Sequence, residues 1–175
     1  GTFDTFNQAI NGSKRDSRSD YISSENDNVL VQGVASNSNA LGYFGYAYYA
    51  ANRNKLRALP VESDQGPVMP SLETVQNGSY SPLSRPVFIY VNAKSLKDSS
   101  SLRAFVQYYL NNATQLVEKE GSIPLTKAQY LVVKSKMLKQ VQGTAFGGKI
   151  PVGLTISELL NRNIDQTIKR PEFHQ

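Results

Sequence analysis

Hydrophobic and polar residues follow one another in blocks along this chain, and each block predicts a different kind of element. Near the start, Phe3, Phe6 and Ile10 are spaced by three and four positions, which predicts a short helix with one apolar face. Residues 11–28 are rich in Ser, Asp and Asn and are typical of an exposed loop. The chain therefore opens with a short amphipathic helix followed by a long polar connection.

The next forty residues mix helical and β-prone patterns. Residues 41–46 favour a strand in which Gly42 and Gly45 permit close approach of another backbone. The pattern also predicts three neighbouring elements: a short helix of Val29, Leu30 and Val34 capped by Ser24 or Asn26, a helix over 47–53 and a short strand over 56–61.

Proline and glycine interrupt the middle of the chain before its strongest strand signal. Residues 62–84 carry Pro67, Pro70, Pro82, Gly66 and Gly78, which indicates a connecting or crossing segment, with a single helical turn over 70–75. Residues 86–92 are uncharged and rich in β-branched and aromatic side chains. Their continuous apolarity predicts a strand buried on both faces.

The last third of the chain is predicted to be mainly helical. A helix capped by Ser99 or Ser100 carries apolar residues at Leu102, Phe105, Val106, Tyr109 and Leu110. We expect three further features: a second helical run through Leu116 and Val117 that ends at Gly121, a helix capped by Thr126, and a loop over 143–153. Thr155 and Glu158 have capping-box spacing and predict a last short helix. Mixed strands and helices favour an α/β class, with a break around 62–84.

Composition limits the chemistry that the chain can perform. Apolar residues make up 39% and charged residues 19% of 175 positions, which is ordinary for a globular domain, and no apolar run reaches the ~18 residues of a membrane span. Cysteine is absent, and His174 is the only histidine. No nucleophile–base pair can be assembled from these residues, so an enzyme is the last choice and we expect neither cofactor nor metal. Glu118 and Glu120 could be nominated as acid and base, but a solvated helix end explains them better.

The net charge of +5 is concentrated in one acid-free stretch. This stretch contains Lys127, Lys134, Lys136, Lys139 and Lys149. It could contact phosphates or an acidic partner, but the solvated face of a helix is the simpler interpretation. Aromatic residues interleaved with arginine are missing, so nucleic acid is not an expected partner. The tyrosines of 43–49 could stack on a ligand, although packing is the simpler interpretation.

Several segments, taken in order over residues 1–140, resemble the phosphate-binding proteins of ABC transporters, PstS-like and of the cyanobacterial type. Gly1-Thr2-Phe3-Asp4-Thr5-Phe6 resembles the second half of that family's Ser-Gly-Thr motif. The other segments are similar to its later motifs: Ala40–Tyr49, Pro70–Val75 with Asn77-Gly78 and Tyr80, Leu83–Pro86 leading into Phe88–Val91, and Gly121–Leu125. The chain is thus identified as the C-terminal half of such a periplasmic binding protein.

The resemblance implies an α/β fold with two lobes of the type II periplasmic-binding-protein kind, in which helices flank mixed sheets. Residues 1–61 would form the later part of the second lobe, 62–84 the crossing segment, and 85–175 the elements that complete the first lobe, with the tail. The family's motif also has a Ser before Gly1 and an Arg shortly before that, and both lie outside this chain. The first lobe's own share of the site, including a ligand-binding carboxylate, lies outside it too.

The function implied by the resemblance is capture of inorganic phosphate in the periplasm, without catalysis, for delivery to a membrane permease. The export signal would lie outside this chain. Gly1 and Thr2 would bind the ligand, since a helix start presents backbone N–H groups and a hydroxyl to an oxyanion. Two alternatives remain open: another oxyanion such as sulfate, molybdate or a phosphorylated metabolite, and a scaffold or interaction domain with a vestigial pocket.

A piece of a two-lobed protein should expose apolar faces that the other half would cover. Phe88, Ile89 and Val91 are the residues of the predicted buried strand that would be left open. Large open apolar patches are unusual on a soluble monomer. We therefore expect the isolated chain to pair with itself or with the missing half.

Overall fold

Ten elements follow one another in the computed structural model, which describes residues 1–64, 66–144 and 152–161. In chain order they are α1 (Thr2–Asn11), α2 (Asp27–Ala35), α3 (Tyr46–Ala51), β1 (Val61–Ser63), β2 (Gly66–Val68), α4 (Leu72–Gln76), α5 (Ala93–Asp98), α6 (Ser100–Lys119), α7 (Lys127–Leu138) and α8 (Ile156–Asn161). The described part of the chain is therefore mainly helical, with one small sheet.

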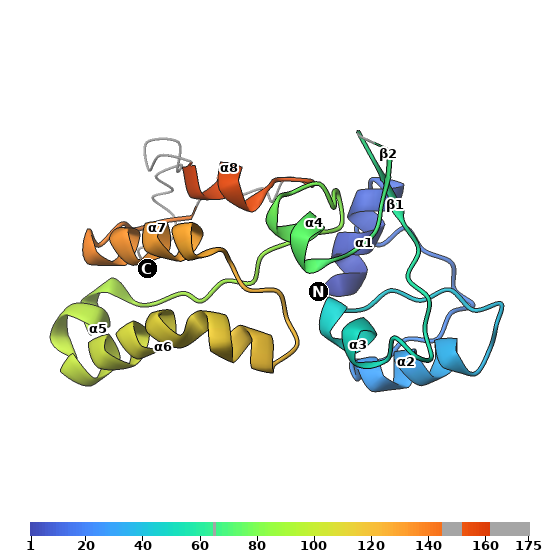
Figure 1. Cartoon of the computed structure of the whole chain (residues 1–175), viewed down its shortest axis with the longest axis horizontal. Coiled ribbons are helices and arrows are strands. Elements are labelled where there is room, and N and C mark those ends of the chain that lie inside the picture. The colour runs from blue at the N-terminus through green and yellow to red at the C-terminus, as the bar shows by residue number, and fades with distance from the viewer. Residues whose placement is uncertain (65, 145–151, 162–175) are drawn as a thin grey trace.

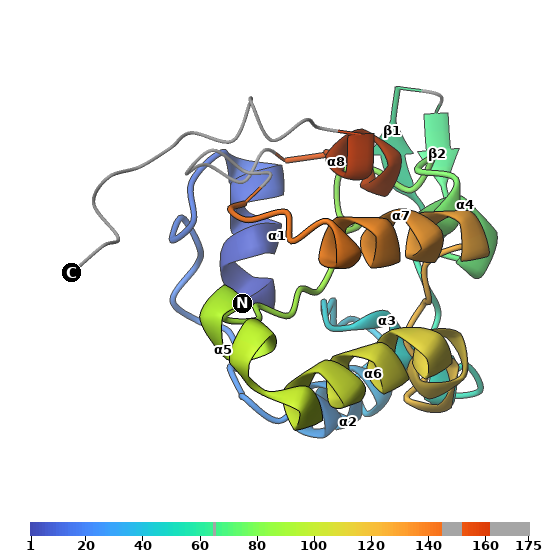
Figure 2. The ribbon, with the colours of Figure 1, turned by 90° about the vertical axis from the view of Figure 1, so that its left-hand side faces the viewer.

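The elements fall into two groups that meet near the middle of the molecule (Figure 1). Helices α1, α2 and α3 and the β1–β2 hairpin make up one group, and α5, α6, α7 and α8 make up the other, with α4 between them. Helix α7 packs against both α6 and α8, and α5 packs against α6. The turned view in Figure 2 shows α8, α7 and α6 stacked in that order.

Side-chain caps fix where most of these helices begin. Asn26 accepts a hydrogen bond from the Asn28 amide before α2, and Ser99 accepts one from Leu102 before α6. Thr126 and Gln129 form a reciprocal capping box at the start of α7. A cap replaced by alanine typically costs about 1 kcal/mol, so these residues define the boundaries of the helices.

Few side chains are fully buried in the described part of the chain. The buried apolar residues come from α2, α6 and α8, namely Val31, Val106, Leu110, Ala113 and Leu159. Many large apolar side chains stay exposed, including Val87 at 94% and Tyr90 at 79% of their surface. Contiguous exposed apolar surface usually marks a contact site, so these residues indicate a face that another part of a protein covers.

Contacts between residues far apart in sequence hold the two groups together. The Gln76 side chain donates a hydrogen bond of 2.8 Å to the Pro124 carbonyl, which ties α4 to the loop after α6. Gly121 has a φ of 77° and lies against Ala47 of α3, where a Cβ would come within 3.4 Å of the Ala47 side chain. Glycine is favoured here because of both the left-handed conformation and the close contact.

The predicted helices are confirmed, with small differences in their bounds. Residues 1–10, the Asn26-capped region, 47–53, 70–75, the long region after Ser99, the Thr126-capped region and the Thr155 capping box all form helices. The two helical runs expected before Gly121 are one continuous helix, α6. The expected loop over 143–153 lies only partly within the described residues, and Lys149 and His174 lie outside them.

Two predicted short strands are wrong. Residues 41–46 form no strand, and the strand expected over 56–61 is replaced by a hairpin that pairs Val61 with Val68 and Ser63 with Gly66. A strand exists only where a partner accepts its backbone hydrogen bonds, and local propensity does not supply one. The neighbours of Gly42 and Gly45 are side chains rather than the expected backbone, and a Cβ at Gly42 would lie 2.5 Å from Cγ2 of Val34.

The expected strand over 86–92 is also wrong in this structure. The segment forms no ladder with any described residue, and Val87, Phe88, Ile89 and Tyr90 are exposed rather than buried on both faces. Its apolar side chains are therefore largely open to solvent in the part of the chain that the structure describes. The prediction of open apolar faces on an incomplete fold agrees with this exposure.

The predicted α/β fold class agrees with the structure only at a coarse level. Helices combine with a small sheet, as in a piece of an α/β protein, but the described ranges contain one two-stranded antiparallel sheet and no larger mixed sheet. Among the same residues, no helix combines the length and apolarity needed to cross a membrane.

Candidate anion site at the start of helix α1

Helix α1 begins with backbone amides that no side chain caps. Gly1 is the N-cap residue and makes no side-chain cap hydrogen bond. The first helical backbone bond runs from the Thr5 amide to the Gly1 carbonyl, at 3.2 Å. The N–H groups of Thr2, Phe3 and Asp4 precede this bond, so they have no carbonyl partner within the helix. A helix start of this kind presents donors and a partial positive charge to an anion.

Two threonine hydroxyls and one guanidinium lie beside these amides. Arg85 donates from Nη2 to the Thr2 hydroxyl at 2.9 Å and from Nη1 to the Thr5 hydroxyl at 3.1 Å. The Thr5 hydroxyl donates in turn to the Gly1 carbonyl at 3.0 Å. The first turn of α1 therefore has two hydroxyls and the permanent cation of Arg85 beside its amides.

The charges around the first turn are mixed. Arg85 adds a positive charge where the helix is already positive, and Asp4 in the first turn adds a negative one. A carboxylate near a helix N-terminus is favourable to the helix, whereas a guanidinium there is not. The arginine therefore creates a local positive field that an anion would neutralise.

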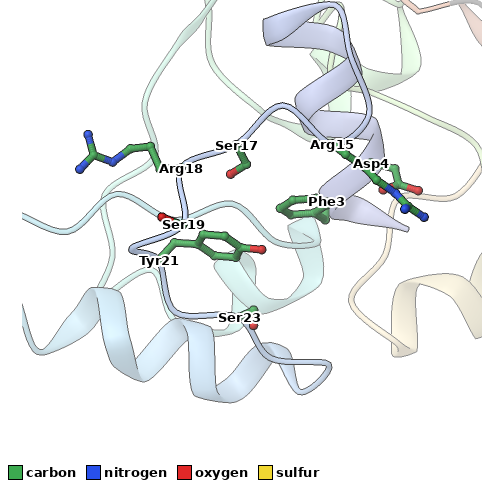
Figure 3. Close-up of a pocket in the computed structure, with 8 residues that line it drawn as sticks. All are labelled: Phe3, Asp4, Arg15, Ser17, Arg18, Ser19, Tyr21 and Ser23. Atoms are coloured by element: carbon green, nitrogen blue, oxygen red, sulfur yellow. The ribbon is translucent and has the colours of Figure 1, made fainter.

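An open depression lies next to the same turn, as Figure 3 shows. It has a volume of about 600 Å³, and its lining residues are Phe3, Asp4, Arg15, Ser17, Arg18, Ser19, Tyr21 and Ser23. Phe3 and Tyr21 stack in it with their ring centroids 5.8 Å apart.

The two arginines of this depression differ in their partners. Arg18 pairs with Asp20 at 2.5 Å, with both side chains strongly exposed, and the hydrogen bond from Arg18 lowers the pKa of the Asp20 carboxyl. Such an exposed pair contributes little stability, but it neutralises the charge of Arg18. Arg15 has no ion-pair partner among the residues that the structure describes.

Helix α1 is held in place from its other side by a buried polar residue and an aromatic stack. The Asn7 side chain is 3% exposed, donates to the Phe3 carbonyl at 2.9 Å and accepts from the Asn11 side chain at 3.2 Å. Phe6 stacks on Tyr43 with ring centroids 3.9 Å apart. Burial raises the pKa of Tyr43, and a hydrogen bond with Asn7 opposes that rise. These contacts fix the orientation of the helix and hence of its first turn.

The residues predicted to bind a ligand, Gly1 and Thr2, both lie at this helix start. Arg85 was not predicted to belong with them, because 83 positions separate it from Thr2 and only the fold brings the two together. The one signal in the sequence was a lone cation directly before an apolar run, and that pattern is common on surfaces.

Other residues considered from the sequence do not gather into a site. Glu118 and Glu120 are exposed at the end of α6, as expected for a solvated surface. Tyr46 accepts a hydrogen bond from Arg53 at 2.7 Å and packs edge-on against Tyr49, so these tyrosines are engaged with their own segment. No group of His, Asp and Glu side chains suited to a metal ion occurs in the described ranges.

Comparison with known proteins gives a consistent result. No family model matches the chain. Protein SphX of Synechocystis sp. is 48% identical over 162 residues, covering 93% of this chain and 48% of the relative. Phosphate-binding protein PstS of Staphylococcus saprophyticus is 36% identical over 138 residues, covering 78% of this chain and 42% of the relative.

A solved structure points the same way. The crystal structure of a possible phosphate binding protein from Planctomyces limnophilus superposes with a TM-score of 0.65 at 41% identity, covering 81% of this chain and 51% of that one. This chain thus spans about half the length of the curated relatives it matches. The similarity inferred from the sequence motifs is confirmed.

Proposed function

We propose that this chain, a relative of the PstS phosphate-binding proteins, is the phosphate-binding component of an ABC-type uptake system and binds inorganic phosphate without chemistry. The observation that carries the proposal is the first turn of α1, where uncapped amides, the Thr2 hydroxyl and the Arg85 guanidinium converge. The amides and the hydroxyl suit a tetrahedral oxyanion, whose oxygens accept several hydrogen bonds, and the guanidinium adds a positive field beside them.

The binding mechanism follows from the kind of groups that are present. The amides and the hydroxyl donate hydrogen bonds to the ligand, the guanidinium supplies a fixed positive charge, and none of these groups needs to lose a proton. A ligand held only by donors is captured and released unchanged, which is what a transport protein requires. The proposal therefore assigns no catalytic residue to this chain.

The donors on this chain face the ligand from one side only. A helix N-terminus contributes about 0.3–1 kcal/mol toward an exposed charge, and up to ~2 kcal/mol in a partly buried geometry. A dissociation constant of 1 µM corresponds to about 8 kcal/mol, so these donors alone leave a large deficit. We propose that a second lobe closes over the anion and excludes water, which strengthens each hydrogen bond.

The lobes are assigned along the chain as the motifs imply. Residues 1–61 belong to the later part of the second lobe, 62–84 cross between lobes, and 85–175 complete the first lobe. Apart from Val61, the β1–β2 hairpin lies in the proposed crossing segment, which is therefore more structured than a simple connection. Periplasmic location and delivery to a membrane permease are part of the same proposal, with support from the PstS relatives.

Two further functions remain as alternatives. The same donors would also bind sulfate, molybdate or a phosphorylated metabolite, since the start of a helix attracts any oxyanion in principle. A scaffold or interaction domain with a vestigial pocket would keep the fold but bind none of these anions. Ligand titration separates all three possibilities.

The test is calorimetric titration of the protein extended to the full length of its relatives. Phosphate, sulfate and molybdate are compared, first with the unchanged protein and then with Thr2→Val, which keeps the side-chain shape but removes the hydroxyl. Losing a hydrogen bond to a charged group costs about 1.5–3 kcal/mol, so we expect Thr2→Val to weaken phosphate binding ~10- to 100-fold.

Thr114→Val is the matched control, because Thr114 lies in α6 away from this turn. The proposal predicts that this variant binds phosphate like the unchanged protein. Tighter binding of sulfate or molybdate than of phosphate would replace the ligand, and no binding of any anion would favour the scaffold alternative.

A further inference from the structure

Arg85 reaches the first turn of α1 from the segment that follows the crossing region. Its two terminal nitrogens divide between two hydroxyls on one face of the helix, Thr2 at 2.9 Å and Thr5 at 3.1 Å. The two contacts span 83 and 80 positions of sequence. Arg85 is exposed, so water competes for its donors and the contacts add little to folding stability.

The two threonine hydroxyls use their protons differently. Thr5 accepts from Arg85 and donates its own proton to the Gly1 carbonyl at 3.0 Å, so its hydrogen-bonding capacity serves the helix. Thr2 accepts from Arg85, and its hydroxyl proton has no acceptor within residues 1–64, 66–144 and 152–161. A hydroxyl whose lone pair is taken by a cation directs its proton elsewhere, and polarisation by that cation makes it a stronger donor.

A guanidinium at this position is unfavourable for the helix by itself. The N-terminal end of a helix repels cations, and a negative charge there, such as that of Asp4 or of a bound anion, offsets the repulsion. The hydroxyl geometry and the charge thus favour the same interpretation, in which Arg85 prepares the helix start for a negatively charged ligand.

We propose that Arg85 is a positioning residue for the oxyanion, holding and polarising the Thr2 hydroxyl so that its proton points at the ligand. This inference rests on the proposed function, because it takes Thr2 to be a ligand-binding residue. It adds a residue from the segment after the crossing region to a site otherwise built at the start of α1. Arg85 acts through Thr2 rather than as a direct contact to the anion.

The experiment is a double-mutant cycle on the full-length protein, read by phosphate calorimetry. Arg85→Gln removes the charge, Arg85→Lys keeps it but cannot bridge two hydroxyls in the same way, and Thr2→Val removes the group through which Arg85 acts. We expect Arg85→Gln to weaken phosphate binding about tenfold, as for a charge-assisted hydrogen bond, and Arg85→Lys to restore part of that loss. In the Thr2→Val background, Arg85→Gln should change affinity less than about twofold, because coupled residues are not additive.

Arg57→Gln is the matched control, since Arg57 is an exposed arginine that takes no part in these contacts. It removes the same charge and should leave phosphate affinity within about twofold, as exposed charges are largely screened by salt. Thermal unfolding without phosphate is measured on each variant, and Arg85→Gln should not lower the midpoint by more than Arg57→Gln does.

The outcomes separate this inference from the proposed function. If Thr2→Val leaves phosphate binding unchanged, the proposed site at the start of α1 is wrong, and so is the proposed role of Arg85. If Thr2→Val weakens binding while Arg85→Gln does not, the site stands and the inference is wrong. Equal losses from Arg85→Gln with and without the Thr2 hydroxyl would also overturn it, since Arg85 would then act independently of Thr2.

Discussion

At the scale of single residues, helix α1 is held by one buried polar side chain. Asn7 is the buried polar residue of the described chain, and it bonds to backbone and side chain within its own helix and to Tyr43 outside it. Buried polar groups cost free energy unless they are paired, so its bonds matter more than those of exposed neighbours.

Replacing Asn7 by Ala should lower the free energy of unfolding by about 1–3 kcal/mol. The reason is that Asn7 is buried, and its hydrogen bonds to Phe3, Asn11 and Tyr43 would all be lost. Urea unfolding measures the change. Gln8→Ala is the control, since the Gln8 bond to the Gly12 carbonyl is exposed and its loss should cost little. Equal destabilisation by the two variants would contradict the importance of burial here.

A second residue-scale prediction concerns Gly42, whose absent Cβ leaves room for Val34. A Cβ at this position would lie 2.5 Å from Val34 Cγ2, well inside van der Waals contact. Gly42→Ala should therefore destabilise the protein by about 1–3 kcal/mol, the usual cost of overpacking. Adding Val34→Ala removes the clash, and the double variant should lose less stability by urea unfolding than the two single changes summed. Strict additivity would show that the two residues are not in contact.

At the scale of elements, the sequence predicted helices well and strands poorly. Helices carry their own hydrogen bonds and their own start signals, so Asn26, Ser99 and Thr126 could be recognised as caps from sequence. A strand depends on a partner that sequence does not specify. Residues 41–46 and 86–92 have β-prone composition, yet neither forms a ladder in the described chain.

The candidate site was predictable to a similar extent. Gly1 and Thr2 belong to one local motif, and they lie together at a helix start. Arg85 comes from a distant segment, and its place beside Thr2 depends on the path of the chain between them. Long-range contacts of this kind cannot be read from local periodicity.

The exposed segment 86–92 leads to a prediction about association. Val87 and Ile89 are exposed at 94% and 52%, and such apolar surface favours contact with another copy. The isolated chain should therefore self-associate as its concentration rises. A double variant that carries both Val87→Lys and Ile89→Lys should be closer to a 19.3 kDa monomer when its mass is measured by light scattering.

The control for this prediction is Ile22→Lys, because Ile22 is 74% exposed but lies in the polar loop before α2. This variant should associate like the unchanged chain. An unchanged chain that stays monomeric at every concentration would mean that segment 86–92 does not drive assembly.

At the scale of the whole molecule, the chain has a thin core and one face of a proposed ligand site. Its relatives are about twice as long, and a protein of that length could supply both missing surfaces. Residues 1–175 alone should therefore bind phosphate weakly, with a dissociation constant near or above ~1 mM, since ~1 mM corresponds to only about 4 kcal/mol. Calorimetry on the isolated chain checks this expectation, and micromolar binding would contradict the need for a second lobe.

Binding of phosphate at the first turn of α1, as proposed here, should be visible in the backbone amide chemical shifts of that turn. In the protein extended to the length of its relatives, the amides of Thr2, Phe3 and Asp4 should shift on adding phosphate, and the shifts should saturate along the calorimetric curve, because these amides are expected to donate to the anion. Sulfate at the same concentration should move them far less. Phosphate binding that shifts other amides and leaves these three unmoved would place the ligand elsewhere and rule out the proposed site.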